Sequence, residues 1–194
     1  AANAVTLATT AALGKKIRDK EILEDSVEAA VSAGVTVTGA FDDASASYYG
    51  GFVVTDNKQR RILRRDEIPE EYYVLFHVPP TKSYTASVDL REFRKLTRIS
   101  ELAHRMALGG HYWEALIMNG LAHSIVLGWE PRVAIEAMSA GAIASGLSGK
   151  GPATVALVVK RKIRKVHRAM SQFEGQIIEA RLNNRKASIV AEHF

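Results

Sequence analysis

The chain has no cysteine, which excludes disulfide bonds and thiolate metal sites. This absence fits a reducing compartment, and we expect a cytoplasmic protein. No apolar run approaches the ~18 residues that a membrane-spanning helix needs, so we expect no membrane partner. The first thirteen residues carry no basic leader and do not resemble a cleavable signal peptide. Internal repeats and low-complexity linkers are missing as well.

Several signatures of catalysis are also missing. The six histidines show no metal-ligand spacing, because His104 and His111 are seven apart and His123 stands alone. No Gly-x-Ser-x-Gly motif of a serine hydrolase occurs. Gly149 and Lys150 are followed by Gly151 where a Walker phosphate loop needs Ser or Thr, so that pattern fails. The metal ligands therefore stay unassigned.

The composition is that of a globular protein, with 194 residues of which 47% are apolar and 24% charged. The net charge of +5 favours anionic partners without selecting one. The basic run 160–168 contains Ile163 and Val166, and Met170 follows at helical spacing. We interpret its charges as the solvated face of an amphipathic helix and expect no nucleic-acid partner.

Hydrophobic periodicity predicts an α+β fold with helices over a largely antiparallel sheet. The pattern predicts a hairpin around Asp56 and Asn57, an exposed loop at 81–88 and a glycine-dense turn at 145–152. Helices are predicted at 1–13, 19–33, around 99–106, at 112–127, from Pro131 and at 161–173. Strands are predicted at 52–55, 60–63, 72–78, 154–159 and 176–182.

Two segments carry candidate chemistry. Asp42 and Asp43 would point to opposite faces of a strand, or would act as caps at a helix N-terminus, or one of them would serve catalysis. Gly146, Gly149 and Gly151 free the backbone to approach an anion, although the same glycines suit an ordinary turn before a strand. From the residues alone, the role of the two aspartates and the role of the glycine-rich turn both stay open.

Together these segments resemble the GHMP kinase superfamily, and within it the archaeal type of shikimate kinase. The resemblance is carried by VTVTGAFDDASASYYGG at 35–51 and AGAIASGLSGKGP at 140–152, and by the opening residues 1–4. It extends from residue 1 to about residue 190. It implies a ribosomal-protein-S5-like half, completed by residues 1–65, and a ferredoxin-like C-terminal half at residues 66–194.

The resemblance implies ATP- and Mg²⁺-dependent phosphorylation of a shikimate hydroxyl in aromatic amino acid biosynthesis. Asp43 matches the catalytic Asp, with Asp42 as the alternative if one residue is inserted. The nucleotide would be bound by two sets of residues, Ala1, Ala2 and Asn3, and Gly146, Ser148, Gly149 and Gly151. Glu28 is a weaker candidate for an acidic metal partner.

In the family a serine-rich phosphate loop precedes the residues that resemble Ala1–Ala4. We therefore expect this chain to be the C-terminal portion of a longer protein, inactive alone and completed by its N-terminal portion. The alternatives are another GHMP kinase, acting on homoserine or mevalonate, and a non-catalytic nucleotide-binding fragment. A homo-oligomer stays open, and so does recognition of the substrate carboxylate by Arg91, Arg94, Arg98 or Arg105.

Overall fold

The computed structural model of the chain describes residues 1–36, 39–81 and 94–190. The chain forms two compact units, one of residues 1–68 together with the tail from Asn183, the other of residues 69–182. The division into residues 1–65 and 66–194 that the resemblance implies stays a prediction.

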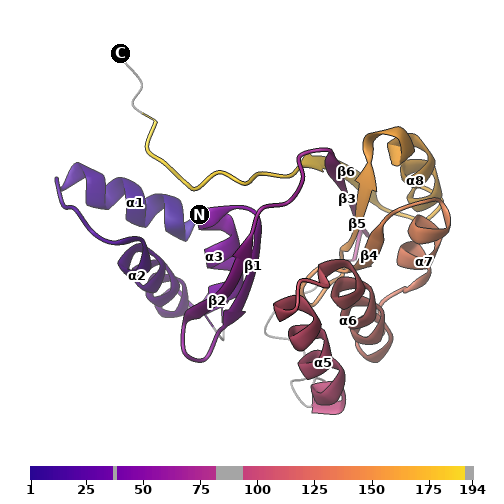
Figure 1. The fold of residues 1–194 in the computed structure, drawn as a ribbon, viewed down its shortest axis with the longest axis horizontal. Coiled ribbons are helices and arrows are strands. Elements are labelled where there is room, and N and C mark those ends of the chain that lie inside the picture. Colours follow the sequence, from indigo (N-terminus) through magenta and orange to yellow (C-terminus); the bar gives the residue numbers. More distant parts are fainter. Residues whose placement is uncertain (37–38, 82–93, 191–194) are drawn as a thin grey trace. The chain divides into compact units, whose positions relative to one another are not determined.

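Among the described residues, the first unit combines three helices with a hairpin (Figure 1). Its elements are α1 (Ala2–Ala12), α2 (Asp19–Ser32), α3 (Phe41–Tyr49), β1 (Phe52–Asp56) and β2 (Arg61–Asp66), the strands being antiparallel. The helices predicted at 1–13 and 19–33 and the hairpin are confirmed. The segment around Asp42 and Asp43 is helical, so the two carboxylates do not lie on opposite faces of a strand.

The core of the first unit lies between α2 and α3. Ile22, Leu23 and Val27 recur at helical spacing on α2 and pack with Phe41 and Tyr48 of α3, each at most 2% exposed. Burial of such large side chains contributes about 1.5–3 kcal/mol each. This packing fixes α3, which carries both aspartates, on α2.

The second unit is a four-stranded sheet with helices. Its elements in chain order are β3 (Tyr72–Val78), α5 (Thr97–Leu108), α6 (Tyr112–Val126), α7 (Arg132–Ser139), β4 (Ala144–Leu147), β5 (Thr154–Val159), the 3-10 helix η2 (Lys160–Lys162), α8 (Ile163–Met170) and β6 (Gln176–Arg181). The strand order is β4-β5-β3-β6 and every pair is antiparallel. This is the order of a ferredoxin-like unit, as predicted.

Alternation along β3 positions the core of the second unit. Tyr73 and Leu75 lie on one face of the sheet and pack with Val133 of α7 and with Val166 and Met170 of α8. The neighbouring β5 is a nearly continuous apolar run, with Ala156 and Val158 fully buried. The α+β class predicted from the sequence is therefore confirmed.

The structure differs from the sequence predictions in two segments of the second unit. The turn predicted over residues 145–152 is wrong at its start, because Ala144–Leu147 is a buried strand paired with β5. The predicted helix 161–173 is a 3-10 turn followed by α8, which ends at Met170. The predicted loop 81–88 lies, beyond Thr81, outside the described residues.

In the described part of the chain, every helix is too short or too polar to cross a bilayer.

Candidate functional site

A pocket of about 260 Å³ opens in the first unit beside α3. Four segments meet there: the beginning of α1, one face of α2, the turn before α3 and one face of α3. The lining residues are Ala1, Ala2, Asn3, Ser26, Val27, Ala30, Thr36, Gly39, Ala40, Asp43, Ala44 and Ser47. The pocket thus joins the two parts of the candidate site that belong to this unit.

Asp43 lies in the first turn of α3 and lines this pocket. Ala40 begins the helix in a left-handed conformation with φ 43°, which turns the chain sharply into α3. The helix dipole favours a carboxylate in the first turn. Ser47, one turn later, lines the same pocket. The pocket therefore offers a carboxylate that can accept a proton and a hydroxyl beside it.

Asp42 points to a different neighbour. Its Oδ1 accepts a hydrogen bond from Asn57 Nδ2 at 2.9 Å, and its backbone N–H donates to Asn57 Oδ1 at 3.1 Å. Consecutive helical residues project about 100° apart, because a turn holds 3.6 residues. Asp42 therefore ties the start of α3 to the turn between β1 and β2, whereas Asp43 faces the pocket.

Asn3 joins α1 to α3. Its Nδ2 donates to the carbonyl oxygen of Ala44 at 2.8 Å and to Ser47 Oγ at 3.4 Å, and the residue is only 9% exposed. Its buried Oδ1 has no partner among the described residues. Ala1 and Ala2 line the pocket at the N-terminus of α1, where backbone N–H groups and the helix dipole favour an anion. A direct contact of Asn3 with nucleotide stays a prediction.

The glycine-rich segment lies in the second unit. Gly146 belongs to β4 and contacts α6 so closely that a Cβ there would lie 2.7 Å from the carbonyl oxygen of Leu116. Gly149 has φ +56° and open space around its Cα, whereas a Cβ on Gly151 would meet the Trp129 ring at 2.7 Å. Packing accounts for Gly146 and Gly151, and Gly149 is the glycine that a ligand could approach.

Trp129 orders this turn. Its indole N–H donates to the carbonyl oxygen of Lys150 at 2.9 Å. The backbone N–H of Ser148 donates to the carbonyl oxygen of Ala153 at 2.8 Å. The turn at residues 148–152 is therefore preformed by its own contacts. The binding roles of Gly146, Ser148, Gly149 and Gly151 stay predictions.

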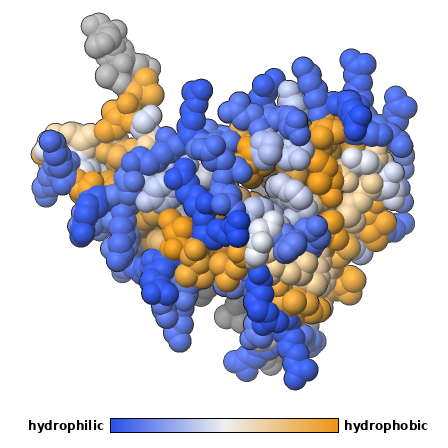
Figure 2. Space-filling model, in the orientation of Figure 1, coloured by the Kyte–Doolittle hydropathy of each residue, from blue (hydrophilic) through white to orange (hydrophobic). Residues whose placement is uncertain are grey.

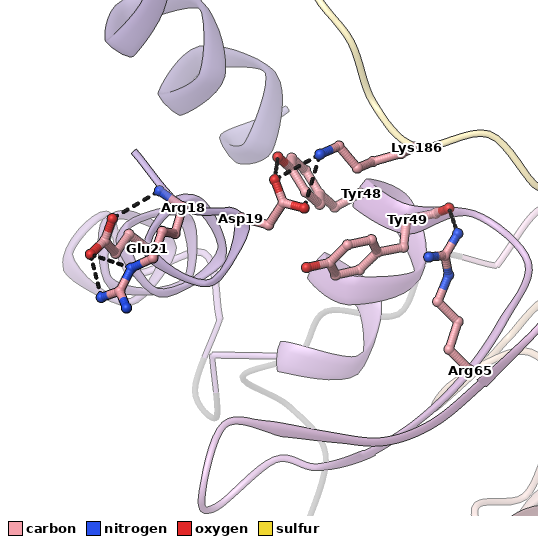
Figure 3. Close-up of polar contacts among 7 residues, drawn as sticks. All are labelled: Arg18, Asp19, Glu21, Tyr48, Tyr49, Arg65 and Lys186. Atoms are coloured by element: carbon pink, nitrogen blue, oxygen red, sulfur yellow. Dashed lines mark hydrogen bonds and ion pairs between the residues drawn. The ribbon is translucent and has the colours of Figure 1, made fainter. Parts of the chain in front are cut away.

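A second polar cluster surrounds the last turn of α3 (Figure 3). Tyr48 donates its phenol proton to Asp19 Oδ1 at 2.9 Å, and Lys186 Nζ contacts both oxygens of Asp19 at 2.8 and 2.9 Å. Lys186 also lies over the Tyr48 ring, 5.6 Å from its centroid. The Lys186 hydrogen bond, more than any other contact, lowers the pKa of Asp19, against the effect of burial. Sequence reasoning missed this cluster, since its members are up to 167 positions apart.

We expect Tyr48 to titrate later than an exposed tyrosine. Burial, followed by the hydrogen bond to Asp19, raises the pKa of Tyr48 from 10.0 to about 12. Because the folded pKa is raised, its contribution to stability is complete below about pH 10 and is lost as the pH rises through about 12. Burial also raises the pKa of Tyr49, so the late part of an ultraviolet absorbance titration is assigned by substitution: Tyr48→Phe should remove the contribution of Tyr48. A Tyr48 signal that titrates near pH 10 in the folded chain would contradict the buried contact.

None of the other charged candidates among the described residues lines the pocket. Among the described residues no three His, Asp or Glu side chains are grouped as a metal site. Glu28 forms an exposed ion pair with Arg60 at 3.1 Å and does not line the pocket. The basic residues of η2 and α8 lie mainly on the hydrophilic exterior (Figure 2). Arg94, Arg98 and Arg105 are exposed, and Arg91 lies outside the described residues.

No protein-family model matches the chain, but curated relatives do. The chain is 42% identical over 166 residues to the shikimate kinase of Methanobrevibacter smithii, and 43% identical over 187 residues to that of Methanothrix thermoacetophila. These matches cover 86% and 96% of this chain. They cover 57% and 64% of the relatives, so the chain spans about three fifths of their length.

Solved structures show the same fold at low identity. The homoserine kinase of Cytophaga hutchinsonii superposes with a TM-score of 0.66 at 19% identity, over 91% of this chain and 62% of that one. The mevalonate kinase of L. major gives 0.64 at 17% identity, over 97% and 66%. The fold is thus that of the GHMP kinases. In sequence, the chain is similar over most of its length to archaeal shikimate kinases.

Proposed function

We propose that the protein containing this chain transfers the γ-phosphoryl group of ATP to a hydroxyl of shikimate. The observation that carries the proposal is the pocket in which Asp43 faces the N-terminus of α1. Phosphoryl transfer needs an oriented hydroxyl and stabilisation of phosphate charge. One wall of this pocket offers a carboxylate and another offers a helix N-terminus.

In this proposal Asp43 orients the acceptor hydroxyl and accepts its proton as the oxygen attacks phosphorus. General-base assistance of this kind contributes about 10²–10⁴-fold to the rate.

Ala1 and Ala2 place the positive end of α1 beside the phosphates. The turn at residues 148–152 would contact the nucleotide through Gly149 and the Ser148 hydroxyl, with Gly146 and Gly151 shaping the segment. Mg²⁺ is usually held by one or two carboxylates plus substrate phosphates. Asp43, the only carboxylate among the described residues of the pocket, is assigned to the acceptor hydroxyl, so the Mg²⁺ ligands stay unassigned.

The serine-rich phosphate loop that the resemblance places before Ala1 is part of this proposal. We infer that the N-terminal portion of the protein supplies this loop and completes the phosphate site. The chain alone is then expected to lack activity. A cytoplasmic location and the absence of a nucleic-acid partner remain predictions.

The test is an acceptor comparison with the full-length protein. ADP release with Mg-ATP should depend on shikimate, while homoserine and mevalonate should give the rate without acceptor. Product analysis should show a monophosphate ester of shikimate. Turnover of homoserine or mevalonate without turnover of shikimate would replace the substrate and leave the kinase class intact. ATP binding with no turnover of any of the three would instead support a non-catalytic nucleotide-binding protein.

A further inference from the structure

The tail that follows β6 is bound along the first unit. We call residues 183–187 the strap. The backbone N–H of Gly51 donates to the carbonyl oxygen of Asn183 at 2.8 Å, and the N–H of Ala187 donates to that of Tyr48 at 2.6 Å. A Cβ on Gly50 would lie 2.5 Å from the Asn183 oxygen, at a φ of +68°. The glycine pair therefore provides the close approach that the strap needs.

The strap is also held by side chains. Asn184 pairs its amide with both backbone groups of Ile68, accepting from its N–H at 3.0 Å and donating to its carbonyl at 2.8 Å. Lys186 reaches Asp19 at the start of α2, and Asp19 in turn accepts from Tyr48 (Figure 3). The strap thus connects three parts of the first unit: the segment after β2, the start of α2 and the end of α3.

These contacts satisfy the end of α3 in particular. The last carbonyl groups of a helix lack partners within the helix. Here the Tyr48 carbonyl accepts from Ala187 of the strap, and the Tyr49 carbonyl accepts from Arg65 of β2 at 3.0 Å. At the other end, Asn57 holds Asp42. Helix α3 is therefore fixed at both ends, with Asp43 between them.

The strap contacts α3 a short distance from the Asp43 carboxylate. Asp43 precedes Tyr48 by five residues, which is roughly 7.5 Å along a helix axis at 1.5 Å per residue. A shift at the last turn would reach Asp43 through a hydrogen-bonded helix. Proton transfer and in-line attack require the carboxylate within hydrogen-bond reach of the acceptor hydroxyl, and a misplacement of 1 Å can cost about 100-fold.

We propose that Lys186, acting through Asp19 and Tyr48, is a positioning residue that sets Asp43 for phosphoryl transfer. This inference rests on the proposed function and extends it from the pocket to the C-terminal strap. Lys186 is not among the described residues that line the pocket. Its effect is therefore expected in the catalytic step and not in substrate binding.

The experiment compares variants of the full-length protein in the shikimate assay, well below its unfolding temperature. Lys186→Met should lower kcat on the order of tenfold or more, with KM values for ATP and shikimate within about twofold. Lys186→Arg keeps the charge and should restore most of the rate. Lys58→Met is the matched control, because Lys58 is exposed in the hairpin turn, and its kinetics should equal those of the unchanged protein.

A double variant separates positioning from general loosening. If Lys186 acts through Asp43, Lys186→Met should have little further effect on the residual rate of Asp43→Asn. An equal loss in both backgrounds, an unchanged kcat for Lys186→Met, or failure of Lys186→Arg to restore the rate would overturn the positioning role. An unchanged protein that turns over none of the three acceptors would instead refute the proposed kinase function. If the unchanged protein phosphorylates homoserine or mevalonate in place of shikimate, the Lys186 variants are compared with that acceptor.

Discussion

Asp43→Asn in the full-length protein is expected to lower kcat by at least about 100-fold. Asparagine is nearly isosteric, so the pocket keeps its shape, but its amide cannot accept the proton of the acceptor hydroxyl. The KM for ATP should change little, because phosphate binding is assigned to α1 and the loops around it. Steady-state kinetics with shikimate and ATP, each varied at saturating concentration of the other, measure both parameters.

Asp42→Asn provides the matched control one residue away. Its side-chain oxygen can still accept the hydrogen bond from Asn57 Nδ2, so activity within a few-fold of the unchanged protein is expected. Loss of turnover in Asp42→Asn alone would move the catalytic role by one residue. Full activity in both variants would leave the two carboxylates with only a structural role at the start of α3.

Gly120→Ala should destabilise the second unit even though alanine is the better helix former. Propensity alone would favour the alanine by about 1 kcal/mol. Its Cβ, however, would lie 2.6 Å from both Gly146 Cα and the backbone nitrogen of Leu147 in β4. Overpacking against backbone costs about 1–3 kcal/mol or more, because strand and helix must move apart. With the close backbone contact placing the cost in the upper part of that range, we expect a net loss of about 1–2 kcal/mol in the free energy of unfolding.

Tryptophan fluorescence during urea unfolding measures this loss, because the chain's two tryptophans, Trp113 and Trp129, both lie in the second unit. Gly149→Asn is the control, at a glycine with open space and a left-handed conformation that asparagine tolerates. It should cost less than about 1 kcal/mol. A Gly120→Ala chain as stable as the unchanged one would show that α6 and β4 are not in tight contact.

The sequence predicted most elements because their patterns are local. The apolar spacing of Ile22, Leu23 and Val27 indicated α2, and the run at residues 72–78 indicated β3. Strand β4 escaped prediction because it is short and contains Gly146, a residue that usually weakens strands. Its stability comes from pairing with β5 and packing on α6, which no local pattern reports.

The candidate site was predictable in part. The Asp-rich run indicated chemistry, but only the direction of the side chains on α3 separates Asp43 at the pocket from Asp42 at Asn57. The hydrogen bond from the Asn3 amide to α3 was not predicted from the sequence, and the contact of Asn3 with nucleotide stays a prediction. The Gly50–Gly51 pair was visible in the sequence, yet its reason is a chain segment more than 130 positions later. Contacts of such separation leave no periodic signal.

The strap also has a practical consequence for anyone who divides this polypeptide. All helices and strands described here end by Arg181, so a gene cut after that codon would still encode each of them. Its product would nevertheless lose the partners of the Gly51 N–H, of both Ile68 backbone groups and of the Tyr48 carbonyl. Expressing residues 1–68 by themselves would deprive the same groups of these hydrogen-bond partners. The segment after β6, which has no regular secondary structure, therefore helps to hold the first unit together. An affinity tag should be attached beyond this segment.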